Sequence, residues 1–174
     1  MKRVIAYTDG SCNAKNGKGG FGSYMEIHNP DNSFSTSTIS RGFFNTKTGR
    51  MELGAVISAL SYCLEIDNVV SIKIMSDSQY VVNTINKGWY RGWAISNFRN
   101  IKNRDLIEAL VILYEYIMDE LRIKVEFEWV KGHSGVFGNE VADSLAREGY
   151  RLPDEQLTDD NFNNDNGSGG FVNW

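Results

Sequence analysis

Alternating apolar and polar positions near the start of the chain predict a buried β-strand. In residues 3–12, apolar and β-branched side chains alternate, and a single acid interrupts them late in the run. Residues 21–28 and 34–44 show strand patterns as well, and a turn at residues 29–32 joins them. Three consecutive strands with short connections predict an antiparallel meander.

The rest of the chain to residue 150 alternates between helical and strand patterns. Helical spacing of apolar residues predicts helices at about 50–66, 79–86, 104–121 and 139–150. Shorter apolar runs predict strands at 69–75 and 123–130, which long connections allow to run parallel to the first strand. We therefore predict an α/β fold with a five-stranded mixed sheet, three antiparallel strands and then two parallel ones, flanked by helices.

The composition changes at residue 151. Residues 151–174 hold five acids and one arginine, so residues 1–150 are neutral overall although the net charge of the chain is −4. Few apolar residues occur in this segment, which predicts one domain over 1–150 and an acidic, disordered tail over 151–174. The low isoelectric point is thus weak evidence against a nucleic-acid partner.

Cysteine usage and hydropathy indicate the compartment. Cys12 and Cys63 lie in a strand-like and a helix-like pattern, which predicts reduced thiols and no disulfide. No apolar run approaches the roughly 18 residues that a membrane helix needs. Asp9 interrupts the apolar run after Arg3 before it could form a signal-peptide core. We expect a cytoplasmic protein that does not contact the membrane.

Four acids occupy unusual positions in these elements. Asp9 and Asp77 lie at or beside strand ends, Glu52 lies in the first turn of a predicted helix, and Asp143 lies in the last helix. Each has an ordinary explanation, such as a turn, a helix dipole or a solvated face. If they met, they would repel one another unless cations lay between them. Oxygen ligands without Cys or His favour Mg²⁺ or Mn²⁺, and two such ions roughly 4 Å apart serve phosphodiester hydrolysis.

The motifs around these acids resemble type 1 ribonuclease H over about residues 2–149. They occur in the family's order, in the segments Thr8–Cys12, Arg50–Leu53, Ser76–Val81, Trp129–Gly135 and Asn139–Asp143. The resemblance implies a ribonuclease H-like fold and an endonuclease that hydrolyses the RNA strand of RNA–DNA hybrids. It also implies two Mg²⁺ ions, with Mn²⁺ as a substitute, and products with 5′-phosphate and 3′-hydroxyl ends.

The resemblance assigns roles to individual residues. The metal ligands correspond to Asp9, Glu52, Asp77 and Asp143, and a mobile-loop histidine that shuttles a proton or helps product leave corresponds to His133. Contacts in the hybrid's minor groove correspond to Cys12, Asn13, Gln79 and Asn139. Near the DNA-phosphate pocket lie Asn45 and Thr46, and either Lys15 or Asn16 takes the place of a pocket asparagine.

Residues 87–104 resemble the basic handle of many bacterial members of the family, and we call them the handle. Trp89, Arg91 and Trp93 interleave rings and cations there, which suits sugars and phosphates of a DNA strand. The alternative is that one of the two tryptophans packs in the core. The handle is less basic than typical examples, so we expect weaker and more salt-sensitive binding.

Other functions are compatible with these residues. A proofreading-type 3′–5′ exonuclease would need Asp-x-Glu on the first strand, whereas Gly10 and Ser11 follow Asp9. Another nuclease of the superfamily or a catalytically inactive hybrid-binding module are the remaining alternatives. We expect a monomer, and the apolar end of the tail at Phe171–Trp174 is a candidate contact for a replication protein.

Overall fold

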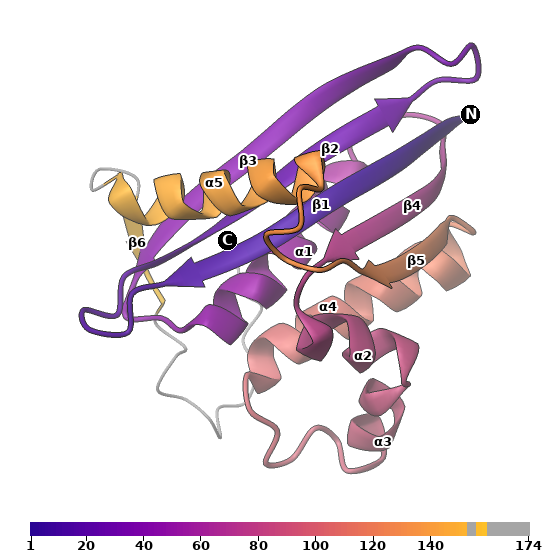
Figure 1. Ribbon diagram of the computed structural model, residues 1–174. Helices are drawn as coiled ribbons and strands as arrows, with labels where there is room; N and C mark the ends of the chain where they lie inside the picture. Colours follow the sequence, from indigo (N-terminus) through magenta and orange to yellow (C-terminus); the bar gives the residue numbers. More distant parts are fainter. Residues whose placement is uncertain (153–155, 160–174) are drawn as a thin grey trace.

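A six-stranded mixed sheet in the order β5-β4-β1-β2-β3-β6 forms the centre of the computed structural model, which describes residues 1–152 and 156–159 (Figure 1). The antiparallel meander consists of β1 (Lys2–Cys12), β2 (Gly19–His28) and β3 (Phe34–Phe44). On the other side of β1, β4 (Val69–Ser76) and β5 (Lys124–Trp129) run parallel to it. The predicted fold class and strand directions are confirmed.

The predicted number of five strands is wrong, because β6 (Gln156–Thr158) adds a sixth strand parallel to β3. This three-residue strand is too short to show periodicity, and it lies in a polar segment. The backbone N–H of Asp159 continues the pairing with the carbonyl of Phe44 at 2.9 Å. The disorder that we predicted is therefore wrong for residues 156–159, whereas Phe171–Trp174 lies outside the described residues.

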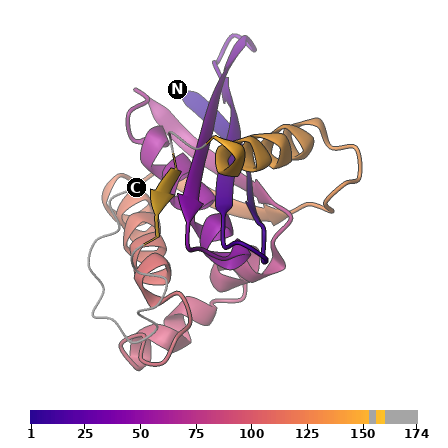
Figure 2. The ribbon, with the colours of Figure 1, turned by 90° about the vertical axis from the view of Figure 1, so that its left-hand side faces the viewer.

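Helices cover the two faces of the sheet, as the edge-on view in Figure 2 shows. One face packs against α1 (Thr48–Cys63), and α4 (Arg104–Glu115) packs on α1 and continues into a π-helical turn, η1 (Tyr116–Glu120). The opposite face carries α5 (Phe137–Arg151), which crosses β1, β2 and β3. The main core lies between the sheet and α1, where Val4, Ala6, Leu53 and Leu60 are fully or almost fully buried.

Element boundaries differ modestly from the predicted ones. Because α1 begins at Thr48, Glu52 lies in its second turn and not in the first. The handle contains α3 (Trp89–Ile95), which follows α2 (Gln79–Asn86), and then an irregular segment up to α4. In the described part of the chain, no helix combines the length and hydropathy needed to cross a bilayer.

Candidate active site

The parallel pairing of β1 with β4 places Asp9 beside Asp77. Thr8 lies opposite Ser76 in the register of these strands, so the next residue of each is the acid. Asp9 is only 7% exposed, and its Oδ1 accepts a hydrogen bond from the backbone N–H of Gly10 at 2.8 Å. The backbone of Asp77 is held as well, because its carbonyl accepts a hydrogen bond from the indole of Trp129 at 3.0 Å.

Asp143 reaches this point because α5 packs directly on the backbone of β2. Asp9 lies opposite Gly22 in the antiparallel register of β1 and β2. A Cβ on Gly22 would lie 2.5 Å from the carbonyl oxygen of Ala142, so only glycine admits the helix at this distance. The residue after Ala142 is Asp143, whose carboxylate lies close enough to that of Asp9 to favour its protonated form.

A second glycine brings Glu52 to the site from the other face of the sheet. A Cβ on Gly10 would lie 2.3 Å from the backbone nitrogen of Glu52, so α1 touches β1 next to Asp9. The hydroxyl of Ser78 donates to Oε2 of Glu52 at 2.8 Å. Since Ser78 also caps the start of α2 directly after Asp77, this bond connects Glu52 to the β4 side of the site.

The electrostatics of the site disfavour a full set of negative charges. The pKa of Asp9 is raised from 3.8 to about 8, first by burial and then by the charge of Asp77 and the hydrogen bond and charge of Asp143. Burial also raises the pKa of Glu52, although the hydrogen bond from Ser78 opposes this shift. Burial and like charge both act against the ionised form of a carboxyl, and a cation between the groups would reverse the effect.

The donor set fits a hard divalent cation. All four groups are carboxylates, the ligands that Mg²⁺ and Mn²⁺ prefer. Within residues 1–152 and 156–159, however, no three His, Cys, Asp or Glu side chains are grouped closely enough to hold a metal ion as they stand. In the part of the chain that the structure describes, the cation paired with these acids is Arg147, whose half-exposed guanidinium lies 3.2 Å from Asp143 one turn along α5.

His133 lies on the loop between β5 and α5, next to the acids. Its side chain is exposed and its backbone is left-handed, with φ of 52°. Neighbouring Gly132 packs against Asp77, because a Cβ there would lie 2.7 Å from a carboxylate oxygen of that residue. In the described structure the imidazole of His133 has no hydrogen-bond partner, so it is accessible to a substrate.

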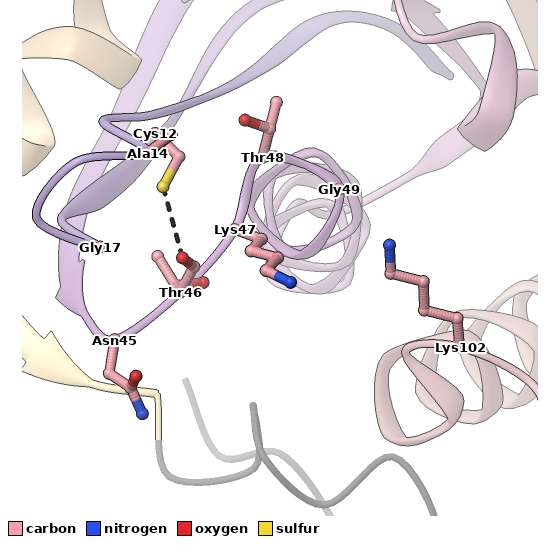
Figure 3. Close-up of a pocket in the computed structure, with 9 residues that line it drawn as sticks. All are labelled: Cys12, Ala14, Gly17, Asn45, Thr46, Lys47, Thr48, Gly49 and Lys102. Atoms are coloured by element: carbon pink, nitrogen blue, oxygen red, sulfur yellow. Dashed lines mark hydrogen bonds between the residues drawn. The ribbon is translucent and has the colours of Figure 1, made fainter.

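A pocket of about 480 Å³ lies at the N-terminal end of α1, and we call it the α1 pocket (Figure 3). It is lined by Cys12, Ala14 and Gly17 on one side, by residues 45–49 on the other, and by Lys102 of the handle. Lys47 at the start of α1 and Lys102 of the handle extend into the space between them from facing sides (Figure 3). A helix N-terminus flanked by two lysines favours an anion.

The candidate phosphate-binding residues differ in how they meet this pocket. Asn45 is exposed at its edge with φ of 56°, a backbone conformation that Asn tolerates. Thr46 is only 3% exposed. Asn13 and Asn16 are exposed, but their side-chain oxygens accept hydrogen bonds from the backbone N–H groups of Lys15 and Lys18 within the same loop.

The other predicted minor-groove residues fall into two groups. Gln79 is exposed at the start of α2, directly beyond Asp77 and Ser78. Asn139 is 2% exposed, and its amide nitrogen has no hydrogen-bond partner in the described structure. Asn139 therefore has almost no surface to offer a substrate in this conformation.

The two handle tryptophans have different environments. Trp93 packs against the main core, whereas Trp89 is 38% exposed with the ammonium of Lys87 5.9 Å from its ring centroid. Arg91 lies 5.5 Å from the ring of Tyr90 and remains exposed. Of the alternatives left open for these tryptophans, core packing thus applies to Trp93.

Sequence reasoning missed two basic residues near the site, Lys47 and Arg50. The motif includes Arg50 without giving it a role, although a charge on the apolar side of a predicted helix is itself a signal that it has buried partners. Lys47 could have been recognised from its position directly before the helix, where a cation adds to the positive helix terminus.

Comparison with known proteins identifies relatives over most of the chain. A family model described as RNase H matches residues 1–151. A protein named Ribonuclease H from Jannaschia sp. (strain CCS1) is 39% identical over 155 residues, which are 86% of this chain and 92% of the relative. Ribonuclease HI from Haemophilus ducreyi is 38% identical over 157 residues, 88% of this chain and 94% of the relative.

Solved structures share the fold. LC9-RNase H1, described as a type 1 RNase H with the type 2 active-site motif, superposes with a TM-score of 0.76 at 26% identity, over 87% of this chain and 73% of that one. LC11-RNase H1, solved in complex with an RNA/DNA hybrid, superposes with a TM-score of 0.61 at 21% identity, over 85% and 96% of the two chains.

Proposed function

Because the chain belongs to the ribonuclease H family, we propose that it is an endonuclease that hydrolyses the RNA strand of RNA–DNA hybrids. In this proposal Asp9, Glu52, Asp77 and Asp143 hold two Mg²⁺ ions, for which Mn²⁺ can substitute. The observation that carries the proposal is the convergence of the acids: the pairing of β1 with β4 sets Asp9 beside Asp77, and close packing at Gly22 and Gly10 brings Asp143 and Glu52 to the same place. Such a site is stable in its charged form only when cations compensate it.

Each part of the site has a distinct task in this reaction. When bound, the two cations supply an activated water and stabilise the departing 3′ oxygen, which leaves 5′-phosphate and 3′-hydroxyl ends. The N–H of Gly10 holds the carboxylate of Asp9 and the indole of Trp129 holds the backbone of Asp77, which restricts both residues before substrate arrives. The exposed imidazole of His133 takes up or delivers a proton at the reacting phosphate, or assists release of product.

The surface around the acids suits a hybrid. In this proposal Cys12, Asn13 and Gln79 contact the RNA 2′-hydroxyls in the minor groove, and the unpartnered amide of Asn139 joins them once this buried side chain becomes accessible. The α1 pocket takes a phosphate of the DNA strand with Asn45, the backbone of Thr46 and either Lys15 or Asn16. The handle contacts the DNA strand further along through Trp89 and Arg91, while Trp93 anchors it to the core.

We also propose a monomer that works in the cytoplasm. The thiols of Cys12 and Cys63 are both free, which suits a reducing compartment. A contact between the end of the tail and a replication protein remains part of this proposal. Size-exclusion chromatography with light scattering tests the monomer, and a pull-down with the chain shortened after residue 159 tests the tail contact.

A cleavage assay tests the proposed reaction. The full chain is mixed with an end-labelled RNA–DNA hybrid, duplex RNA or duplex DNA, with Mg²⁺ or with EDTA. Cleavage of only the RNA strand of the hybrid, and only with Mg²⁺, is the expected result. Binding of the hybrid without cleavage would instead identify an inactive hybrid-binding module, and cleavage of DNA would indicate another nuclease of the superfamily.

A further inference from the structure

A buried arginine joins the C-terminal strand to two helices. The guanidinium of Arg50 on α1 is 2% exposed and donates to both oxygens of Asp159, from Nε at 2.6 Å and from Nη2 at 2.9 Å. It also pairs with both oxygens of Asp105 on α4, at 2.8 and 2.7 Å. Although burial lowers the pKa of Arg50, its hydrogen bonds to Asp105 and Asp159 raise that pKa overall, so the group stays charged.

Asp159 differs from Asp105 in a further contact. Its Oδ2 also accepts a hydrogen bond from the hydroxyl of Thr46 at 2.9 Å, and Asp159 itself is only 1% exposed. Its backbone N–H donates to the carbonyl of Phe44, directly before the residues that line the α1 pocket. Asp105 has no contact with this loop among the described hydrogen bonds.

Thr46 is the residue at which the two loops of the α1 pocket meet. Its N–H donates to the carbonyl of Gly17 at 2.9 Å, and its carbonyl accepts the thiol of Cys12 at 3.3 Å (Figure 3). Its methyl packs against Gly19, where a Cβ would lie 2.5 Å away. The position of Thr46 therefore determines the shape of the pocket, and its side-chain hydroxyl is committed to Asp159 and not to a substrate.

We propose that Asp159 is a positioning residue for hybrid binding: it holds Thr46, so that strand β6 sets the geometry of the α1 pocket. This inference rests on the proposed function, in which that pocket takes a phosphate of the DNA strand. Without the carboxylate of Asp159, the buried hydroxyl of Thr46 loses its acceptor and the loop of residues 45–49 is free to shift. The four acids do not contact Asp159, so the effect falls on substrate binding and leaves the chemical step intact.

The chain offers a matched control in Asp105. Asp159→Asn and Asp105→Asn each remove one of the two charges that compensate Arg50, and both are expected to lower the thermal midpoint. Only Asp159→Asn also weakens the acceptor of Thr46. A purely structural role of Asp159 would therefore affect hybrid binding to the same extent in both variants.

The test is steady-state cleavage of an RNA–DNA hybrid by the full chain with Mg²⁺. We expect Asp159→Asn to raise KM about tenfold at unchanged kcat, as for loss of a hydrogen bond to a charged group. Asp105→Asn should change KM by less than about twofold. Equal KM values for the two variants would overturn the inference, while a wild-type chain that does not cleave the hybrid would overturn the proposed function instead.

Thr46→Val keeps the test decisive if Asp159→Asn does not fold. Valine retains the methyl against Gly19 and the two backbone contacts, and removes only the hydroxyl. We expect a rise in KM similar to that of Asp159→Asn, and no further rise when the two changes are combined, because they remove the same bond. An unchanged KM in Thr46→Val, or additive effects in the double variant, would contradict the role of Asp159.

Discussion

The carboxylate of Asp9 is buried, lies near two other acids, and is oriented by a hydrogen bond from the N–H of Gly10. Asp9→Asn keeps the shape of this side chain but removes its ability to become an anionic ligand. We expect the hybrid cleavage rate to fall about a thousandfold, since several kcal/mol of transition-state stabilisation depend on a cation site. The midpoint of thermal unfolding in metal-free buffer near pH 7 should change little, because Asn resembles the protonated form of Asp9, which predominates at that pH.

Asp31 supplies the control for that variant. It is exposed in the turn between β2 and β3, and hydrogen bonds from Ser33 lower its pKa, so it is an ordinary ionised surface acid. Asp31→Asn should leave the cleavage rate within about twofold of the wild type. A rate for Asp9→Asn above about a tenth of the wild-type rate would contradict the role of Asp9 as a metal ligand.

The raised pKa of Asp9 also predicts how stability depends on pH. The folded protein holds this proton up to about pH 8, whereas an unfolded chain releases it near the ordinary value of 3.8. Between these values the unfolded state binds fewer protons, so the metal-free free energy of unfolding falls as pH rises from about 4 to about 8. Urea unfolding at several pH values measures this slope, and Asp9→Asn should flatten it.

Addition of Mg²⁺ should reverse this trend. A cation that binds the ionised carboxylates stabilises the folded state in proportion to its occupancy, which rises as Asp9 loses its proton. The shift in unfolding midpoint caused by Mg²⁺ should therefore increase with pH. A shift of equal size at pH 5 and pH 8 would show that the cation does not bind through Asp9.

At the scale of elements, close contact between α1 and β1 depends on Gly10. A Cβ there would lie 2.3 to 2.9 Å from the backbone of Met51 and Glu52, which cannot move without shifting the helix. We expect Gly10→Ala to lower the free energy of unfolding by about 2 kcal/mol and to reduce cleavage strongly, because Glu52 moves away from Asp9. Chemical unfolding and the hybrid assay measure the two effects.

Gly92 on α3 is the matched control for this substitution. A Cβ on Gly92 would meet no atom within 4 Å, and its backbone is helical. Gly92→Ala should raise the free energy of unfolding by up to about 1 kcal/mol, because Ala favours the helix and restricts the unfolded chain. If both variants were destabilised equally, close packing at Gly10 would not be the cause.

The strands of the meander could be predicted because apolar and β-branched residues recur along each of them between short connections, and α4 because its apolar residues keep helical spacing. β6 could not be predicted in this way, since its pairing depends on a buried ion pair with Arg50, more than a hundred residues away in sequence. The proximity of Asp143 to Asp9 could not be predicted from the sequence pattern either. It follows from the pairing of Asp9 with Gly22 and the packing of Ala142 on that glycine, which no local pattern reveals.

At the scale of the whole molecule, the net charge of −4 hides a separation of charges. Acids converge at the strand ends, while Lys47 and Lys102 flank the α1 pocket and Arg91 lies exposed on the handle. A nucleic acid is attracted by the local arrangement of cations near its phosphates more than by the net charge of the protein. The sequence indicated this only when the acidic tail was counted apart from the domain.

The handle and the α1 pocket should act together on the phosphate backbone. The double variant Arg91→Ala, Lys102→Ala removes one cation from each, so fewer counterions are released when the hybrid binds. We expect the slope of log affinity against log salt to become shallower by about 1.5, and affinity to fall in low salt. Fluorescence anisotropy with a labelled hybrid, in the Asp9→Asn background to prevent cleavage, measures both quantities.

The control for this prediction lies at the opposite end of α4. Arg122 and Lys124 are exposed at the amino end of β5, and Lys124 is paired with Glu126 at 3.0 Å. Arg122→Ala, Lys124→Ala removes the same formal charge, so any general effect of net charge would appear in both double variants. We expect its salt slope to equal that of the parent, because these cations lie far from the α1 pocket and the handle. If both double variants lost the same amount of hybrid affinity and the same salt slope, net charge alone would determine hybrid affinity.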